Sequence, residues 1–242
     1  MKRSGAAKLA FLVLIFLVFT ASVARPEFLV LDLFDNLPTG QIPEGWSVVG
    51  EDKGVYVVEN PDANNKSLQI EGVNGGIHVR RAFEPTADTI TVETRFMPVT
   101  MTGGNYGIPY VQEQGVNLGG PVGAVCILLR DGKLDYYNGA WENFATIVEG
   151  KWYEVKIVTS AKNKEFDLYF DGEEIVKGAL HRFEYPALGE LLFGPGVAHT
   201  GGNVFLYDYV VVYEGTEIPF DPFSVSASGK LAAMWGEVKL DN

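Results

Sequence analysis

The side chains best suited to chemistry lie in two alternating segments between residues 77 and 97. His78 and Arg80 share one face of the first segment, and Glu93 and Arg95 share one face of the second. Because successive side chains of a strand point to opposite faces, two neighbouring strands would combine these four into one polar patch. The patch is either the floor of a groove that binds sugar hydroxyls or carboxylates, or a solvated face with cross-strand ion pairs.

The stretch 100–120 is rich in Gly, Asn and Gln and is predicted to be a long loop beside the patch. Long loops are uncommon unless they serve or cover a site. Candidate ligand-binding residues in it are aromatic rings that could stack on sugars and amides that could hold hydroxyl groups: Tyr106, Tyr110, Gln112 and Asn117. Tyr136 and Trp141 are further candidates, although aromatic residues of a buried core would give the same pattern.

The N-terminal segment has the three parts of a secretory signal peptide. These are a basic start, an apolar run and a small-x-small cleavage site: Lys2, Arg3 and Lys8, then 9–19, then 22–24. The run is shorter than the roughly 20 residues that span a bilayer, so we predict cleavage after residue 24, with no stable membrane span. The alternative is an uncleaved anchor. The expected location is extracellular or in the cell envelope.

Charge narrows the range of partners. Cleavage would remove three basic residues, leaving 218 residues and changing the formal charge from −12 to −15. An acidic chain repels phosphate backbones and anionic lipid, so we expect no nucleic acid partner. The one cysteine, Cys126, lies in an apolar run and is predicted to be a packed, inert strand residue.

The elements that must position these residues are strands. About twelve short alternating segments between residues 25 and 218 predict an all-β chain, a two-sheet antiparallel sandwich. The clearest is 150–175, in which two alternating strands form a hairpin that closes at Asp171-Gly172. Asn74-Gly75-Gly76 predicts another hairpin, because glycine supplies the positive φ of tight turns.

Residues 219–242 are predicted to form a linker and a short C-terminal helix. The linker contains Pro219 and Pro222. The helix is indicated by apolar residues at i, i+3, i+4 and i+7: Leu231, Met234, Trp235 and Val238. This amphipathic helix would either pack on a sheet of the same chain or act as a docking tail for a partner.

Three segments together resemble the concanavalin A-like lectin/glucanase superfamily, particularly its laminin-G-like domains. They are LDLFDN at 31–36 with PEGW at 43–46, the hairpin from GKWY to YFDG at 150–172, and FLYDYVVV at 205–212. The resemblance implies a jelly roll over residues 25–218. It also implies a secreted, non-catalytic recognition module that binds carbohydrate or a cell-surface partner, although the fold hosts many functions.

Glycosidases of this superfamily carry E-x-D-x-x-E on one strand, which supplies two carboxylates for acid–base catalysis. The corresponding string here is Glu165-Phe166-Asp167-Leu168-Tyr169-Phe170, in which Phe170 replaces the second glutamate. That motif is not met, so no catalytic residue is assigned. The alternative is a glycan-active hydrolase or lyase that uses the polar patch as its groove.

The resemblance also suggests a structural calcium ion near the terminal strands. Hard cations are bound by several carboxylate, amide and carbonyl oxygens. The positions to test are Asp35, Asn36 and Asp208. The alternative is that Asp208 satisfies backbone amides in a loop.

Overall fold

The structure is a computed structural model that describes residues 27–49, 54–59, 65–72, 78–116, 122–195 and 202–219. Within these ranges the chain is all-β, and it contains no helix that could cross a membrane. The signal peptide and the C-terminal helix predicted above lie outside the described residues.

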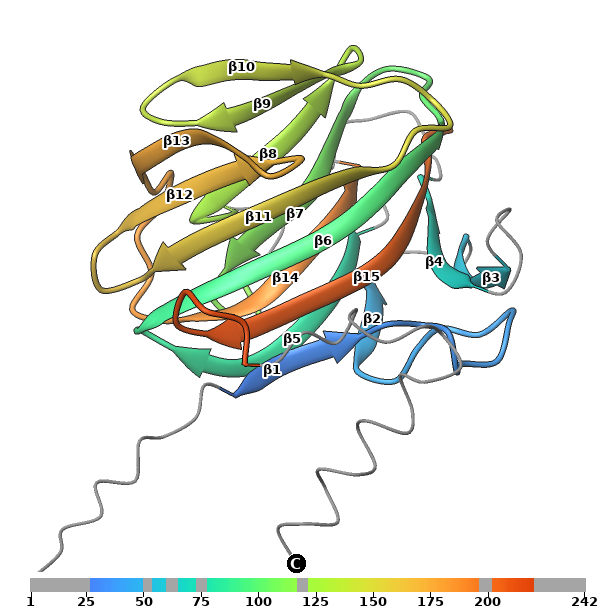
Figure 1. The fold of residues 1–242 in the computed structure, drawn as a ribbon, viewed down its shortest axis with the longest axis horizontal. Coiled ribbons are helices and arrows are strands. Elements are labelled where there is room, and N and C mark those ends of the chain that lie inside the picture. The colour runs from blue at the N-terminus through green and yellow to red at the C-terminus, as the bar shows by residue number, and fades with distance from the viewer. Residues whose placement is uncertain are drawn as a thin grey trace, which may run out of the picture.

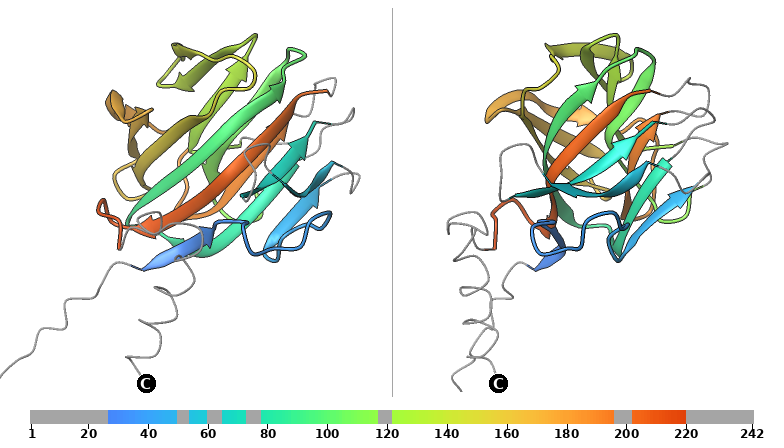
Figure 2. Two further views of the ribbon diagram at one scale, coloured as in Figure 1. Left: turned by 45° about the vertical axis from the view of Figure 1, so that its right-hand side comes forward. Right: turned by 90° about the vertical axis from the view of Figure 1, so that its right-hand side faces the viewer.

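Fifteen strands form two antiparallel sheets that pack face to face (Figure 1; Figure 2). The eight-stranded sheet has the order β13-β12-β11-β6-β15-β4-β3, with β1 also paired to β15. Its strands are β1 (Phe28–Asp32), β3 (Val55–Glu59), β4 (Lys66–Glu71), β6 (Thr89–Thr100), β11 (Tyr153–Ser160), β12 (Glu165–Phe170), β13 (Glu173–Leu180) and β15 (Val204–Glu214). The seven-stranded sheet has the order β10-β9-β8-β7-β14-β5-β2. Its strands are β2 (Trp46–Val49), β5 (His78–Thr86), β7 (Asn105–Gln112), β8 (Val125–Arg130), β9 (Lys133–Tyr137), β10 (Trp141–Thr146) and β14 (Leu188–Pro195). The predicted two-sheet sandwich is confirmed.

The predicted hairpin of residues 150–175 is present as β11, β12 and the turn that leads to β13. Val155 pairs with Phe170, and Ser160 pairs with Glu165 at the other end of the ladder. Asp171 and Gly172, which connect β12 to β13, have φ values of 48° and 82°. Positive φ at both positions is typical of a two-residue hairpin turn, which explains the Asp-Gly sequence.

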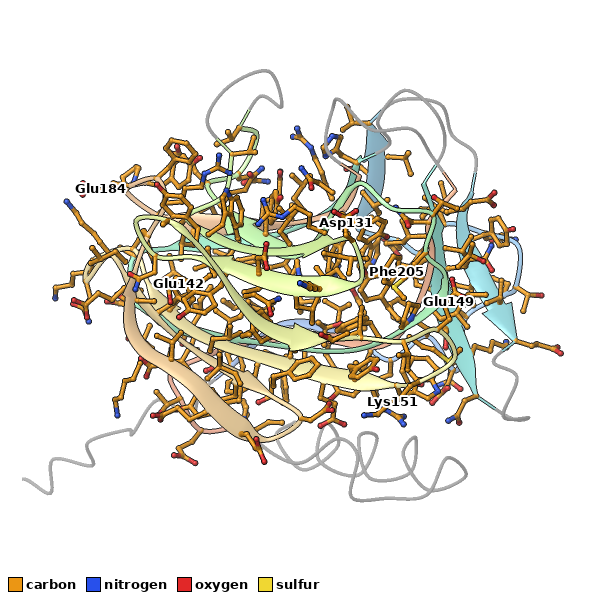
Figure 3. The ribbon with its side chains drawn as sticks, turned by 90° about the horizontal axis from the view of Figure 1, so that it is seen from above. Asp131, Glu142, Glu149, Lys151, Glu184 and Phe205 are labelled. Carbon is orange, nitrogen blue, oxygen red and sulfur yellow. The ribbon has the colours of Figure 1, made fainter. Side chains whose placement is uncertain are left out.

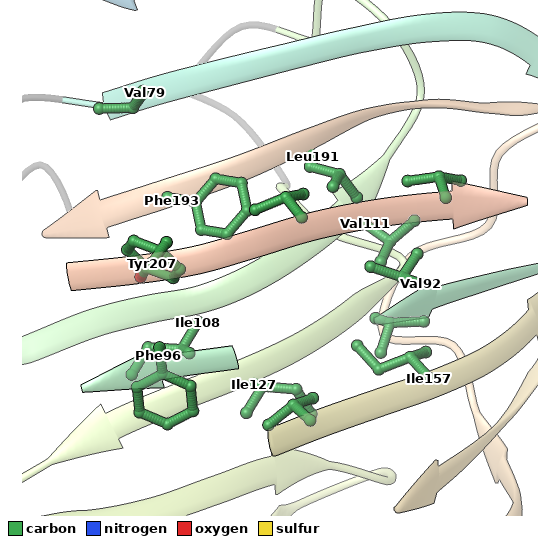
Figure 4. Close-up of a cluster of buried hydrophobic side chains, with 14 of the residues drawn as sticks. Val79, Val92, Phe96, Ile108, Val111, Ile127, Ile157, Leu191, Phe193 and Tyr207 are labelled. Carbon is green, nitrogen blue, oxygen red and sulfur yellow. The ribbon is translucent and has the colours of Figure 1, made fainter. Parts of the chain in front are cut away.

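The space between the sheets is filled by large apolar side chains (Figure 4). Phe96 and Tyr207 from the eight-stranded sheet meet Phe193 from the seven-stranded sheet, and all three are fully buried. Viewed from above, Phe205 lies between the two layers (Figure 3). This core explains why most inward positions of the central strands are apolar, with Thr94 and Thr159 as buried exceptions, and it leaves each sheet with one outer face for function.

One ionic link joins the two sheets at their β1 and β5 strands. The guanidinium of Arg81 donates to both carboxylate oxygens of Asp32, at 2.7 and 3.3 Å, and the indole of Trp46 donates to the same carboxylate at 2.8 Å. Gly45 is required beside this link, because its φ is 80° and a Cβ there would lie 2.7 Å from an Arg81 nitrogen. The entry segment PEGW therefore has a packing role.

Two predictions about connectivity are wrong. The segments on either side of Asn74-Gly75-Gly76 do not pair as a hairpin, because β4 belongs to the eight-stranded sheet and β5 to the seven-stranded sheet. The stretch 100–120 is not a single long loop, since β7 occupies Asn105–Gln112 between β8 and β14. Each of these strands also has a partner far away in the sequence, β15 for β4 and β14 for β7, and local patterns carry no information about such pairings.

Candidate functional site

The predicted polar patch is divided between the two outer faces of the sandwich. His78 and Arg80 lie on β5 of the seven-stranded sheet, whereas Glu93 and Arg95 lie on β6 of the eight-stranded sheet. The prediction that they form one surface is wrong, because the chain crosses from one sheet to the other between β5 and β6. Each outer face is therefore a separate candidate for a binding site.

On the seven-stranded sheet, one row of side chains runs across six strands on the outer face. Arg80 pairs with Leu192, Leu192 with Tyr110, Tyr110 with Cys126, and Tyr137 with Trp141. Ile127 pairs with Tyr136, so Tyr137 is next to Cys126 in the ladder. The row therefore brings together predicted candidates from β5, β7 and β10. The outermost two, Arg80 and Trp141, are more than 60 residues apart along the chain.

A buried polar cluster lies next to this row, built around Glu190 of β14. Glu190 is only 3 % exposed, and its carboxylate accepts hydrogen bonds from the Gln112 side chain at 2.8 Å and the Gly115 amide at 3.1 Å. The Arg80 guanidinium lies 3.5 Å from it. The amide of Gly123 donates to the Gln112 side-chain oxygen at 3.2 Å. These contacts tie β5, β7 and β14 to the segments that follow β7 and precede β8.

His78 lies at the start of β5 and is 5 % exposed. Neither ring nitrogen has a hydrogen-bond partner in the part of the chain that the structure describes. Burial, and then the positive charge of Arg80, lower the pKa of His78 to about 4. The imidazole is therefore neutral at physiological pH.

Beyond Cys126, the row ends in a group that we call the arginine–aromatic cluster: Arg182, Tyr137, Trp141 and Phe183. The Arg182 guanidinium lies 5.4 Å from the Tyr137 ring centroid, 5.3 Å from that of Trp141 and 5.0 Å from that of Phe183. Arg182 lies in the segment between β13 and β14, and the Arg182 backbone amide donates to the Ala124 carbonyl at 2.7 Å. All four side chains are half-buried, so they combine fixed positions with access to solvent.

Arg130 and Asp135 form the edge of this cluster. Arg130 forms an ion pair with Asp135, which is 4 % exposed. The Arg130 guanidinium also lies 6.0 Å from the Trp141 ring centroid. The side-chain amide of Asn143 also donates to Asp135, at 3.2 Å. The buried carboxylate thus has its charge compensated, and the rings above it remain available.

The outer face of the eight-stranded sheet carries a network of ion pairs. Glu93 accepts a hydrogen bond from the Tyr213 hydroxyl at 2.7 Å and lies 3.3 Å from the Lys156 ammonium. Arg95 donates to Asp208 at 2.9 Å and lies 4.9 Å from the ring centroid of Trp152. Trp152 is therefore a half-buried surface residue.

A groove runs over these ion pairs beside the segment that follows β15. Two adjoining hollows, of about 550 and 580 Å³, share six lining residues: Glu93, Glu154, Lys156, Tyr209, Thr216 and Glu217. Glu165 and Asp167 of the incomplete glycosidase motif also lie on this sheet, and Asp167 accepts a hydrogen bond from the Gly178 amide at 2.8 Å. The groove has room for a ligand, and two of its cations, Arg95 and Lys156, are already paired with carboxylates.

Of the other predicted ligand-binding residues, Tyr106 is in the wrong place. Its side chain is fully buried between the sheets and stacks on Phe205 with ring centroids 4.2 Å apart, so it cannot contact a ligand on either surface. Tyr110 and Gln112 lie on the outer face of the seven-stranded sheet, two positions apart on β7. Tyr136 is also a core residue, whereas Trp141 is accessible.

Two of the three predicted calcium ligands are engaged with other groups in the described part of the chain. Asp208 is paired with Arg95, whose positive charge opposes a cation there, and Asp35 accepts a hydrogen bond from the Lys66 amide at 3.1 Å. Asn36 is exposed. Among the described residues no group of three His, Cys, Asp or Glu side chains could hold a metal. These residues fit calcium poorly, and the calcium site stays a prediction.

Two residues of the candidate site gave no signal in the sequence. The sequences around Glu190 and Arg182 are ordinary for strands and loops, and neither residue belongs to a motif. The alternation of β14 places Glu190 outside and Leu191 inside, which is the one pattern that could have suggested it. Arg182 has no such pattern, because it lies between strands.

Comparison with known proteins shows the fold. No protein-family model matches the chain, and no curated protein matches it. A solved sialidase structure matches 78 % of this chain with a TM-score of 0.59 and 14 % identity, over 18 % of the sialidase chain. A carbohydrate esterase from the Shiga toxin-encoding bacteriophage phi24B matches 79 % of this chain and all of its own, with a TM-score of 0.53 and 15 % identity.

A third structure comes from work on endo-acting O-glycanases with which members of the human gut microbiota initiate mucin breakdown. It matches 78 % of this chain and all of its own, with a TM-score of 0.53 and 14 % identity. The chain spans less than a fifth of the sialidase that it matches. At these identities the comparisons show the fold alone, a two-sheet antiparallel β-sandwich, and the lectin/glucanase and laminin-G-like assignments remain predictions.

Proposed function

We propose that this chain is a secreted, non-catalytic module that binds carbohydrate on the outer face of its seven-stranded sheet. The observation that supports this most is the accessible pair of rings, Trp141 and Tyr137, held beside Arg182 at the end of a polar row. The ring centroids of Trp141 and Tyr137 lie 5.4 Å apart at an interplanar angle of 79°. This arrangement offers one ring face to the apolar side of a sugar, with hydrogen-bond donors close by.

The known structures support a carbohydrate ligand over a protein partner. A sialidase, a carbohydrate esterase and a protein from a study of O-glycanases share this sandwich. The predicted signal peptide places the module where glycans are found, outside the cell or in its envelope. A cell-surface protein remains the alternative partner, and a broad, flat interface without dependence on Trp141 would favour it.

The separation of the acidic side chains favours recognition over hydrolysis. Glu190 on β14 and Asp135 on β9 are the two buried carboxylates on this face, with β7 and β8 between them. Three strand spacings place their backbones about 14 Å apart or more. Inverting glycosidases hold their carboxylates roughly 6.5–9.5 Å apart and retaining ones about 5 Å. Both carboxylates are also already bound by an arginine and an amide.

The test is a glycan array with the chain lacking residues 1–24, followed by titration of the strongest binder. We expect Trp141→Ala to weaken binding about tenfold or more, which is about 1.4 kcal/mol. The matched control is Trp152→Ala, which removes the accessible indole of the opposite face and should leave the affinity unchanged. Absence of any glycan binding, or equal losses in the two variants, would overturn the proposal.

A further inference from the structure

Arg182 differs from every other arginine that the structure describes. Four arginines are paired with a carboxylate: Arg80 with Glu190, Arg81 with Asp32, Arg95 with Asp208 and Arg130 with Asp135. Arg182 has no ion pair with any described acidic residue. Its side-chain hydrogen bond goes to the Cys126 sulfur, at 4.0 Å, which is a weak acceptor at long range.

The rings hold the Arg182 guanidinium without neutralising it. Aromatic faces attract a cation through their quadrupole, so Tyr137, Trp141 and Phe183 keep the guanidinium in place. Among the described residues, none of the three rings accepts a hydrogen bond from the guanidinium. The result is a positioned, half-exposed positive charge whose donors are available to a ligand.

The described titratable groups near Arg182 form no ion pair with it, and these include Glu113, whose negative charge acts on Tyr185. Burial raises the pKa of the Cys126 thiol to about 12 and that of Tyr185 to about 12, and it also raises the pKa of Tyr110. All three are therefore neutral at pH 7. Glu184, two residues along the chain, is paired with Lys164.

We propose that Arg182 binds the carboxylate of an acidic sugar whose ring stacks on Trp141. This inference rests on the proposed carbohydrate-binding function and names its ligand class. A guanidinium presents a rigid fork of donors that matches a carboxylate, and stacking on aromatic rings pre-organises it. The local charge of Arg182 offsets the net acidity of the chain, which alone would repel an anionic ligand.

The experiment compares each carboxylated glycan with its own methyl ester. Glycans that contain uronic or sialic acids and their methyl esters are placed on one array at about 150 mM salt. We expect the acids to bind and each ester to bind at least tenfold more weakly. Binding confined to neutral glycans, or equal binding of acid and ester, overturns this inference and leaves the proposed function standing. Binding of no glycan overturns both.

Variants separate a carboxylate contact from a merely structural role. Arg182→Gln should weaken the acid at least tenfold and leave the affinity for the ester unchanged, and Arg182→Lys should fall between, because an ammonium cannot bind bidentately. Arg95→Gln is the matched control, since Arg95 also lies over a tryptophan but is already paired with Asp208. Equal loss of acid and ester binding in Arg182→Gln, with urea unfolding unchanged, would contradict the carboxylate contact.

Discussion

The two outer faces of the sandwich carry similar residues but use them differently. On the eight-stranded sheet, Arg95, Lys156 and Glu93 all have partners of opposite charge or hydrogen-bond donors within 4 Å. They line an open groove. On the seven-stranded sheet, Arg80 and Glu190 are similarly paired, and the Glu190 side chain is only 4 % exposed against 18 % for Glu93, but Arg182 is not paired with any described acid.

This difference separates structural charges from charges that are available to a ligand. An exposed ion pair contributes little to stability, with typical values of about 0–1 kcal/mol, and leaves little free charge. A buried pair is costly to break but is equally closed to a ligand. Only an accessible, positioned and unneutralised group retains its full interaction for a partner, and among the described arginines this is Arg182.

The largest expected difference between the faces concerns their glutamates. Glu190→Gln keeps the size of the side chain but leaves the half-buried Arg80 without a counter-charge, so we expect unfolding free energy to fall by about 3 kcal/mol. Glu93→Gln, the matched change on the other face, should cost less than about 1 kcal/mol. Urea unfolding of both variants measures this. Equal losses would mean that the two networks do not differ in burial as described.

The next expected effect is a dependence of the unfolding free energy on pH, which arises from His78 on the seven-stranded sheet. The pKa of His78 is about 4 in the folded chain against 6.5 when exposed, so the unfolded state binds more protons between these values. Stability from this group is complete above pH 6.5 and is lost as the pH falls towards 4, by about 2 kcal/mol at pH 5. His181, with a pKa also lowered to about 4 by burial, should add a similar loss.

The variant His78→Leu isolates this effect. It removes the titrating group, and we expect it to abolish about half of the stability loss between pH 8 and pH 5 in urea unfolding. His181→Leu is the comparison, because His181 accepts or donates a hydrogen bond with the Thr159 hydroxyl at 2.8 Å and should lose stability at all pH values. An unchanged pH profile in His78→Leu would show that His78 is not held neutral by the fold.

The smallest expected effect is on the eight-stranded face. Arg95→Gln removes two partly exposed ion pairs, with Asp208 and Glu154, and one cation–π contact, so the unfolding free energy should fall by about 0.5–1 kcal/mol. Raising the salt concentration should reduce that difference, because exposed pairs are screened. A loss above 2 kcal/mol would indicate that this face is as tightly coupled as the other.

The sequence predicts the sandwich well because strand alternation and Asp-Gly turns are local signals. Residues 153–160 show this: Tyr153, Val155 and Ile157 are buried, and the polar residues between them point outward. The membership of each strand in a sheet is not local. Strands β5 and β6 are separated by only Ala87 and Asp88, yet β5 pairs with β2 and β14, and β6 with β11 and β15.

The site could be predicted only in part for the same reason. Arg80, Tyr110, Gln112 and Trp141 were found as polar or aromatic candidates, but their common row depends on pairings between distant strands. Arg182 could not be found, because its environment is made by rings from β9 and β10 and by Phe183. What distinguishes it is a missing ion pair, which no residue pattern reports.

The most direct test of the binding face is hydrogen–deuterium exchange of the chain with and without its strongest array ligand. The account predicts slower exchange in β8–β10, Val125–Thr146, and in the segment around Arg182, with no change in β6, β11 and β12. Protection confined to β6, β11 and β12 would place the ligand in the groove of the eight-stranded sheet and contradict the central claim.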